Sequence, residues 1–328
     1  MPTVGNNVDP KGLPMRYFDL HCDTPHEIYT NNAPLDENDL HVSLNKAEVL
    51  SRYAQVMAIW TPKQLDDEKG FTNFNKVMDY LNVELDRLRD RVRICRRGED
   101  VVDAWNANQP AVFLAVEDAR LLGNDISRLK VLYGRGVRFL TLCWGGSSCI
   151  GGSHDTEDGL TPFGELVTQC CFAMGIIPDL SHASDATTAQ VLAMAREAGK
   201  PVIATHSNSR AVYRHTRNLT DEQFCAIRDL GGIVGISFCP PHLTNTKEAP
   251  ATIETLLRHI DHYIDLGGEY TVAMGGDLDG IGHTPEGIRN IADIPAIEQA
   301  MIAHGYHREL IDNILWRNAH NFVCNHLQ

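Results

Sequence analysis

The sequence predicts an α/β protein of the (β/α)8 TIM-barrel type, folded as a single domain over residues 1–328. Two observations lead to this prediction: short apolar segments recur eight times, and longer stretches with helical spacing separate them. Strands that are apolar throughout are buried on both faces, which is typical of parallel sheets covered by helices. A closed barrel of eight strands accounts for both observations most simply.

The predicted strands are rich in Val, Ile and Phe and are bounded by Gly, Pro or polar residues. In chain order they are 15–21, 54–60, 111–117, 137–144, 175–182, 201–207, 231–238 and 270–277. An open doubly wound sheet is the alternative, but no G-x-G-x-x-G sequence follows the first strand. No linker, internal repeat or low-complexity tract divides the chain, so we expect one domain.

Three of the intervening stretches predict helices clearly. Apolar residues in KVMDYLNVELDRLRDRV (76–92) recur at alternating spacings of three and four, which places them on one helix face. The stretch 185–199 has an acidic start and a terminal Gly, and 252–267 opens on Thr with Glu close behind and closes on Gly. These are the usual signals for the two ends of a helix.

Composition and charge exclude several function classes. The chain is 43% hydrophobic and 22% charged, as soluble globular proteins are, and its formal net charge is −14. A strongly acidic chain with no basic stripe is not expected to bind nucleic acid. No apolar run approaches the roughly 20 residues of a membrane-spanning helix, and the first residues do not resemble a secretory signal. Nine scattered cysteines without a C-x-x-C pair indicate reduced thiols, so we expect a cytoplasmic protein.

Polar side chains gather where the predicted strands end. Five of the eight strands finish on or next to a His, Asp or Glu, namely His21 with Asp23, Glu117, His182, His206 and Asp277. In a barrel the carboxyl ends of all strands converge on one mouth, where catalytic groups collect. One such residue is more often an ordinary hydrogen-bonded rim residue, but five coincidences together predict a hydrolytic metal site.

The first strand illustrates the geometry. Side chains two apart on a strand point the same way, so His21 and Asp23 are able to share one metal ion. The side chain of Cys22 then points the other way, toward the helices, and is expected to be a small buried residue.

These residues lie in stretches that resemble the membrane (renal) dipeptidase family, zinc dipeptidases of the amidohydrolase superfamily. The resemblance covers nearly the whole chain. Its stretches are H-x-D in LHCD, VED around Glu117, GLTPFG (159–164), DLSHAS (179–184), ATHSNSRAVYRHTRNLTDEQ (204–223) and MGGDLDG (274–280).

The resemblance implies a dipeptidase with two Zn2+ ions per chain. One ion would be held by His21, Asp23 and Glu117, and the other by Glu117, His182 and His206, so that Glu117 bridges both. It also implies that Arg217 binds the terminal carboxylate of a dipeptide and that the chain forms a homodimer. Asp277 matches the acid that shuttles the proton. Asp279 would face the mouth by strand parity alone, but Asp279-Gly280 has turn chemistry, which favours Asp277.

Two departures from the family pattern concern the substrate. Mammalian members carry a His after the fourth strand where this chain has Trp144, and a Tyr after the seventh where it has Cys239. His154 is able to replace the missing His, although a solvated loop histidine is the simpler interpretation. Hydrolysis of dipeptides, including those with a C-terminal D-residue, is therefore the first hypothesis. Hydrolysis of N-acyl amino acids or other small amides is the second. A non-catalytic metal-binding protein is the third, against which the spare acid Asp277 argues.

Overall fold

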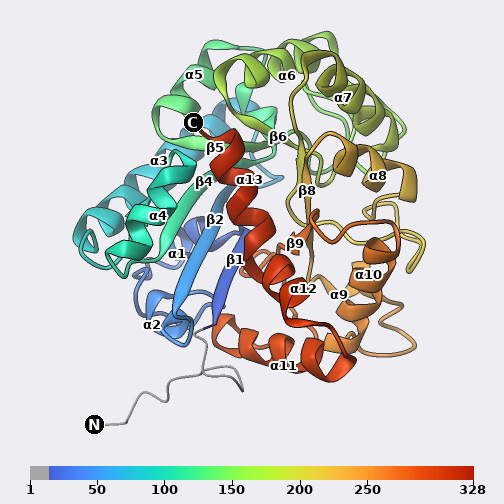
Figure 1. Cartoon of the computed structure of the whole chain (residues 1–328). Coiled ribbons are helices and arrows are strands. Elements are labelled where there is room, and N and C mark those ends of the chain that lie inside the picture. Colours follow the sequence, from blue (N-terminus) through green and yellow to red (C-terminus); the bar gives the residue numbers. More distant parts are fainter. Residues whose placement is uncertain (1–14) are drawn as a thin grey trace.

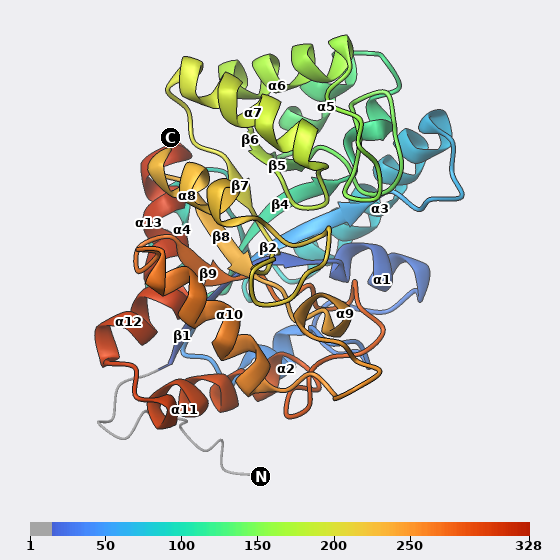
Figure 2. The same ribbon diagram turned by 90° about the vertical axis from the view of Figure 1, so that its right-hand side faces the viewer.

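The computed structural model describes residues 15–328, whose eight parallel strands close into a barrel surrounded by helices (Figures 1 and 2). The predicted fold is confirmed. The barrel strands are β1 (Arg16–Cys22), β2 (Arg52–Trp60), β4 (Ala111–Glu117), β5 (Val137–Thr141), β6 (Ile177–Asp179), β7 (Ile203–Ala204), β8 (Ile233–Ile236) and β9 (Val272–Met274). The first fourteen residues, for which no secretory signal was predicted, lie outside the described residues.

The strand order around the barrel shows one irregularity. The sheet runs β2-β1-β9-β8-β7-β6-β5-β4, and pairing of β2 with β4 closes the ring. The ninth strand, β3 (Arg93–Ile94), pairs with Ala111 and Val112 at the start of β4. Strand β5 pairs with the rest of β4, from Leu114 to Glu117. Strand β3 was not predicted, because two residues are too few to produce a pattern.

Helices connect the strands and cover the outside of the barrel (Figure 2). They are α1 (Thr24–Thr30), α2 (Leu44–Ala47), α3 (Asp67–Arg87), α4 (Gly98–Asn106), α5 (Ser127–Gly134), α6 (Pro162–Met174), α7 (Asp185–Ala198), α8 (Asp221–Asp229), α9 (Pro240–Leu243), α10 (Ile253–Asp265), α11 (Ile294–His304), α12 (Arg308–Asp312) and α13 (Asn318–His326). Short 3-10 helices lie at Ala119–Leu122 and Ile291–Asp293, and a short π-helix at Asn313–Arg317 joins α12 to α13. Among residues 15–328 no helix is both long and apolar enough to cross a bilayer.

The boundaries of the three predicted helices follow their caps. Helix α7 begins where Ser184 Oγ accepts from the amide of Thr187 at 2.9 Å, and it ends at the left-handed Gly199. Helix α10 starts after Thr252, as predicted. Helix α3 covers Asp67–Arg87 rather than 76–92, because Asp66 caps it nine residues earlier than its apolar face suggested.

Two hydrophobic layers hold the barrel. One lies between the strands and the surrounding helices and includes Cys22, which is fully buried. The other fills the barrel interior, where Phe18 and Phe113 stack with ring centroids 6.0 Å apart. Helix α13 lies across the barrel strands in Figure 1. Its residues Phe322 and Val323 belong to this inner layer. Alternating side chains of each strand thus supply both layers.

Helix α13 closes the amino end of the barrel. The Asn318 side-chain amide donates to the carbonyl of Val272, at the start of β9, at 2.7 Å. At the other end of the helix, a Cβ on Gly98 would lie 2.2 Å from Cys324 Cα, so only glycine permits this contact between α4 and α13. With the amino end closed, the carboxyl ends of the strands form the open mouth.

Candidate metal centre

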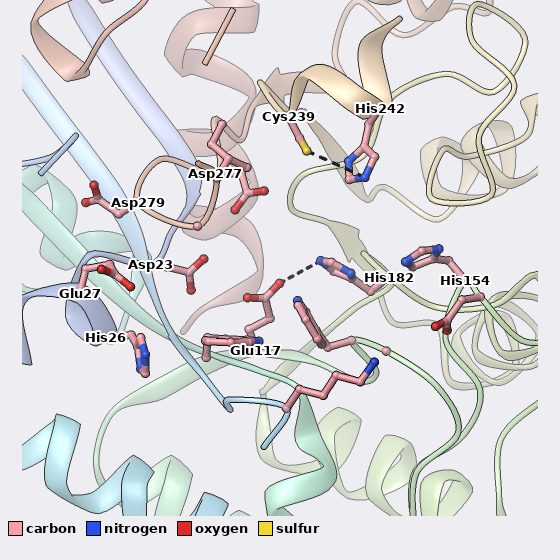
Figure 3. Close-up of a pocket in the computed structure, with 17 residues that line it drawn as sticks. Asp23, His26, Glu27, Glu117, His154, His182, Cys239, His242, Asp277 and Asp279 are labelled. Atoms are coloured by element: carbon pink, nitrogen blue, oxygen red, sulfur yellow. Dashed lines mark hydrogen bonds and ion pairs between the residues drawn. The ribbon is translucent and has the colours of Figure 1, made fainter. Parts of the chain in front are cut away.

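A cavity of about 400 Å³ opens at the carboxyl ends of the strands. Side chains that follow five different strands line it: Asp23 after β1, Glu117 at the end of β4, Trp144 after β5, His182 after β6 and Asp277 after β9. In Figure 3 the carboxylates of Asp23, Glu117 and Asp277 point toward one another. The structure therefore brings the predicted strand-end residues to one place.

Glu117 stands between two groups of ligand-type side chains. Its Oε1 atom lies 3.0 Å from His182 Nε2 and 3.5 Å from His206 Nε2. Its Oε2 atom lies 3.6 Å from His21 Nε2, which is itself 3.7 Å from Asp23 Oδ2. The ligand atoms of each group lie within 4.8 Å of one another. One carboxylate thus presents one oxygen to each group.

Several polar atoms of the two groups are buried without a hydrogen-bond partner among residues 15–328. They include His21 Nε2, Asp23 Oδ1 and His182 Nδ1. The Nε2 atoms of His182 and His206 face each other at 3.0 Å, beside the Glu117 oxygen. Leaving buried polar atoms unpaired is costly, and a divalent cation coordinated by His21 Nε2 and the Asp23 carboxylate would remove that cost for their group, whereas His182 Nδ1 is not the nitrogen that faces Glu117. Imidazole and carboxylate are ligands that Zn2+ accepts, so the residues fit a metal ion.

Burial dominates the electrostatics of the centre. It raises the pKa of Asp277 and, together with the charge of Asp23, that of Glu117. Burial, followed by neighbouring positive charge, lowers the pKa of His182 and His206 well below the ordinary value. A bound cation would counteract the penalty on the carboxylates, and neutral imidazoles are the form that binds metal.

His21 differs from the other two histidines. Burial alone disfavours its imidazolium, but the nearby carboxylates of Glu117 and Asp23 outweigh burial and raise its pKa well above the ordinary value. His21 also belongs to a third group of possible ligands, with His206 and Asp277. The acidic side of the centre therefore attracts positive charge, as a metal site must.

The two aspartates of MGGDLDG have different surroundings. Both follow β9 with positive φ, +57° at Asp277 and +69° at Asp279. The carboxylate of Asp279 accepts from the Thr24 hydroxyl at 2.6 Å and from the Val42 amide at 3.3 Å. The carboxylate of Asp277 instead faces the centre, with Oδ1 3.9 Å from His21 Nε2. Asp279 holds the loop together, whereas Asp277 is directed at the candidate metal ligands.

Arg217 lies buried beside the centre, at 3% exposure. Its Nη1 donates to Ser207 Oγ and its Nη2 to the carbonyl of His206, both at 2.9 Å. Its Nε is buried without a partner, and no carboxylate in the described chain lies within ion-pair distance of the guanidinium. Burial lowers its pKa, opposed by the charge of Asp277. A buried cation without a paired anion is suited to an anionic ligand.

A model of one protein family matches residues 14–323, nearly the whole chain. Its description is membrane dipeptidase, peptidase family M19. The chain belongs to this family. The resemblance stated from the sequence is thereby confirmed, and membership makes the chain a metallopeptidase that hydrolyses peptide bonds.

Curated relatives agree with the assignment to the membrane dipeptidase family. An uncharacterized protein in the pqqA 5′ region of Klebsiella pneumoniae is 33% identical over 238 residues, which cover 70% of this chain and 86% of the relative. Dipeptidase tcpJ of Claviceps purpurea is 28% identical over 245 residues, 74% of this chain and 57% of the relative. The chain thus spans little more than half the length of this fungal relative.

Two solved structures resemble the whole chain. The metallopeptidase dipeptidase AC of family M19 is 29% identical and superposes with a TM-score of 0.88, covering 96% of this chain and 99% of its own. A metallopeptidase from Rhodobacter sphaeroides, solved with a phosphinate mimic of the dipeptide L-Ala-D-Ala, is 27% identical with a TM-score of 0.88, covering 96% and 100%.

The two residues that depart from the mammalian family pattern, and His154, lie in the cavity wall. The Trp144 ring is 5.1 Å from the Trp60 ring and 6.0 Å from His182. The half-buried His154 has its ring 5.9 Å from that of His182, and its Nδ1 is 3.2 Å from Thr216 Oγ1. Burial lowers the pKa of His154 to about 4. This placement differs from the solvated loop that its polar surroundings suggested, because the loop folds back onto His182.

Sequence reasoning missed several cavity residues, among them His26, Trp60 and His242. His242 lies in α9 with Nε2 3.9 Å from Cys239 Sγ (Figure 3), and burial lowers its pKa to about 2. Trp60 ends β2, so the strand-end rule would have found it if aromatic residues had been counted with the charged ones. His26 lies in α1, three residues after Asp23, where sequence alone carries no signal.

Proposed function

We infer that this protein hydrolyses the peptide bond of dipeptides with two Zn2+ ions per chain that share Glu117. The observation that carries this proposal is the division of the Glu117 carboxylate, with Oε1 toward His182 and His206 and Oε2 toward His21. Each oxygen meets its own group of ligands, which supports two ions rather than one. Zinc is favoured by the mixture of imidazole and carboxylate ligands.

Two such ions would lower the pKa of a water from about 15.7 toward about 7 and polarise the scissile carbonyl. The remaining chemistry falls to the chain. Asp277 faces the centre and accepts the proton of the attacking water, then donates it to the departing amine. Burial raises the pKa of Asp277, which suits a carboxyl group that must both accept and release a proton near neutrality.

Arg217 provides the second half of the proposal. Its guanidinium is buried next to His206 without a paired carboxylate, so it is able to bind the terminal carboxylate of the substrate. An anion held this close to the metal ligands leaves room for only a short substrate in a cavity of about 400 Å³. These features favour free dipeptides over longer peptides.

Substrates with a C-terminal D-residue are included in the proposal, because the Rhodobacter sphaeroides relative was solved with an L-Ala-D-Ala mimic. N-acyl amino acids or other small amides remain the alternative. N-acyl amino acids would also present a carboxylate to Arg217 but lack the free amine of a dipeptide. Trp144 and Cys239 line the cavity where mammalian members carry polar side chains, and this apolar wall favours the alternative.

The test is an assay of Zn2+-loaded protein against L,L-dipeptides, L,D-dipeptides and N-acetyl amino acids, together with elemental analysis of metal content. We expect about two ions per chain and turnover of dipeptides. Turnover confined to N-acetyl amino acids would select the alternative substrate. One ion or none in fully active protein would contradict the bridging role of Glu117.

We also propose that the protein acts in the cytoplasm as a homodimer. All nine cysteines lie within the described residues and are free thiols, which a reducing compartment favours. The dimer rests on the family resemblance. Light scattering coupled to size-exclusion chromatography would decide it, since a monomer mass of 36.5 kDa at micromolar concentration would contradict the dimer.

A further inference from the structure

Asp179, the last residue of β6, is fully buried behind the metal centre and accepts four hydrogen bonds. Its Oδ1 accepts from the amides of Ser181 and Thr205, at 3.0 and 2.9 Å. Its Oδ2 accepts from the hydroxyls of Thr141 and Thr205, both at 2.6 Å. The two oxygens therefore have different partners, backbone amides on one side and hydroxyls on the other.

The hydroxyl of Thr205 also contacts a proposed metal ligand. Its Oγ1 lies 2.8 Å from His206 Nδ1. A hydroxyl has one proton, and the carboxylate of Asp179 is able only to accept. Since the shorter, charge-assisted bond to Asp179 takes that proton, His206 Nδ1 must carry a proton of its own and donate it to Thr205.

The position of this proton decides what the other ring nitrogen does. With Nδ1 protonated, a neutral His206 has a bare lone pair on Nε2, which faces Glu117 Oε1 at 3.5 Å. Other partners of the Thr205 hydroxyl compete poorly, because Ser181 Oγ is 3.3 Å away and His21 Nδ1 is 3.5 Å away. A histidine binds metal as the neutral imidazole, so the neutral ring is the form that matters for this site.

We propose that Asp179, acting through Thr205, is a positioning residue that sets the tautomer of His206 and keeps its Nε2 available to bind metal. The tautomer itself follows from hydrogen bonds within the chain. Only its consequence for metal affinity rests on the proposed function.

Asp179→Asn tests which group donates in the hydrogen bond between Thr205 Oγ1 and His206 Nδ1. The new amide keeps its oxygen toward the two backbone N–H groups, since only an oxygen accepts from them, and turns its NH2 group toward the hydroxyls. The Thr205 hydroxyl oxygen then accepts a hydrogen bond from that amide, and its O–H is free to donate a hydrogen bond to His206 Nδ1. The tautomer of His206 should invert, placing a proton on the nitrogen that binds metal.

A matched pair of variants separates this role from packing. Thr205→Val and Thr141→Val each remove one buried hydroxyl that donates to Asp179 Oδ2 at 2.6 Å. Only Thr205 contacts His206. Both variants should lose similar stability, but only Thr205→Val should affect the tautomer. Thr205→Ser retains the hydroxyl and should restore wild-type behaviour.

The tautomer is measured by 15N NMR of metal-free protein with labelled histidine, in which His206→Asn identifies the ring resonances. Zn2+ affinity is measured separately by competition with a chelator. We expect Nδ1–H in the wild type, Thr141→Val and Thr205→Ser, and loss of this preference in Asp179→Asn and Thr205→Val. Zn2+ affinity should fall about 10–100-fold in the latter two.

Persistence of the Nδ1–H tautomer in both Asp179→Asn and Thr205→Val would overturn the proposal. An equal loss of Zn2+ affinity in Thr141→Val and Thr205→Val would overturn it as well, by showing a packing effect. If Asp179→Asn fails to fold, the two threonine variants decide the matter. A wild-type protein that shows the predicted tautomer but binds a single ion would contradict the proposed function and leave the tautomer assignment standing.

Discussion

At its amino end the barrel is closed by α13, whose Phe322 belongs to the same buried apolar cluster as Phe113, whereas at its carboxyl end Glu117 and Asp277 lie buried close to histidines. Apolar packing at the first end removes surface from water and stabilises the fold. Burial at the second end raises the pKa of Glu117 and lowers the pKa values of His182 and His206, at a cost to stability. The barrel thus separates the residues that stabilise it from those that react.

Backbone conformation shows the same contrast. His182, Asp277 and Asp279 all adopt positive φ just after their strands. Such conformations cost non-glycine residues about 1–3 kcal/mol each, and they occur where function requires a particular direction of the side chain. At the amino end, the close contact between α4 and α13 uses Gly98, which carries no side chain to strain.

The largest effect is expected from Glu117→Ala, which should disrupt the candidate metal centre at the carboxyl end of the barrel and leave the packing at the amino end intact. If Glu117 bridges two ions as proposed, both ions should be lost, and kcat/KM should fall by about 10³-fold or more. Elemental analysis and kinetics provide the measurement. His21→Ala is the comparison, since it should mainly weaken one ion. Equal and mild losses in both variants would contradict the bridging role.

Asp277→Asn should separate metal binding from proton transfer. The amide keeps the size of the side chain but accepts no proton, so kcat should fall roughly 10²–10⁴-fold while metal content stays. Asp279→Asn is the control, and it should act more mildly through the hydrogen bonds to Thr24 and Val42. Loss of turnover in Asp279→Asn with near-normal Asp277→Asn would show that the assignment is reversed.

Phe322→Ala should weaken the apolar packing at the amino end of the barrel and leave the candidate metal centre intact. Phe322 is 3% exposed in the inner layer, and its truncation should lower the free energy of unfolding by about 3–5 kcal/mol. Chemical denaturation measures that change. The kcat at a temperature where the variant is folded should stay at the wild-type value. A large drop in kcat would mean that the two ends are coupled.

Arg217→Met should give the smallest effect, confined to substrates with a free carboxylate. Losing a hydrogen bond to a charged group costs about 1.5–3 kcal/mol, or roughly 10–150-fold in kcat/KM. Dipeptides with an amidated C-terminus should be affected much less. If both kinds of substrate lose activity alike, the role of Arg217 is to hold Ser207 and the carbonyl of His206 in place.

The contrast between the ends also explains what could be predicted from sequence. The eight strands were found because both faces of each are apolar, and Glu117 and His182 because strand ends meet at one mouth. Strand lengths were overestimated where the chain turns early: the strand predicted to reach residue 182 ends at Asp179, and His182, with a φ of +70°, lies in the turn that follows. Arg217 came only from family resemblance, because no periodic pattern marks a loop residue. The partners of Asp279 lie 237–255 residues away in sequence, beyond the reach of local signals.

The place of α13 in the chain has a consequence for biosynthesis. The helix that covers the amino end of the barrel is translated after all eight barrel strands. Until about residue 326 has left the ribosome, the inner layer around Phe18 and Phe113 lacks its cover. Exposed apolar surface on a nascent chain invites aggregation or chaperone binding. A ribosome stalled before α13 should therefore hold a complete set of strands that are not yet a stable barrel.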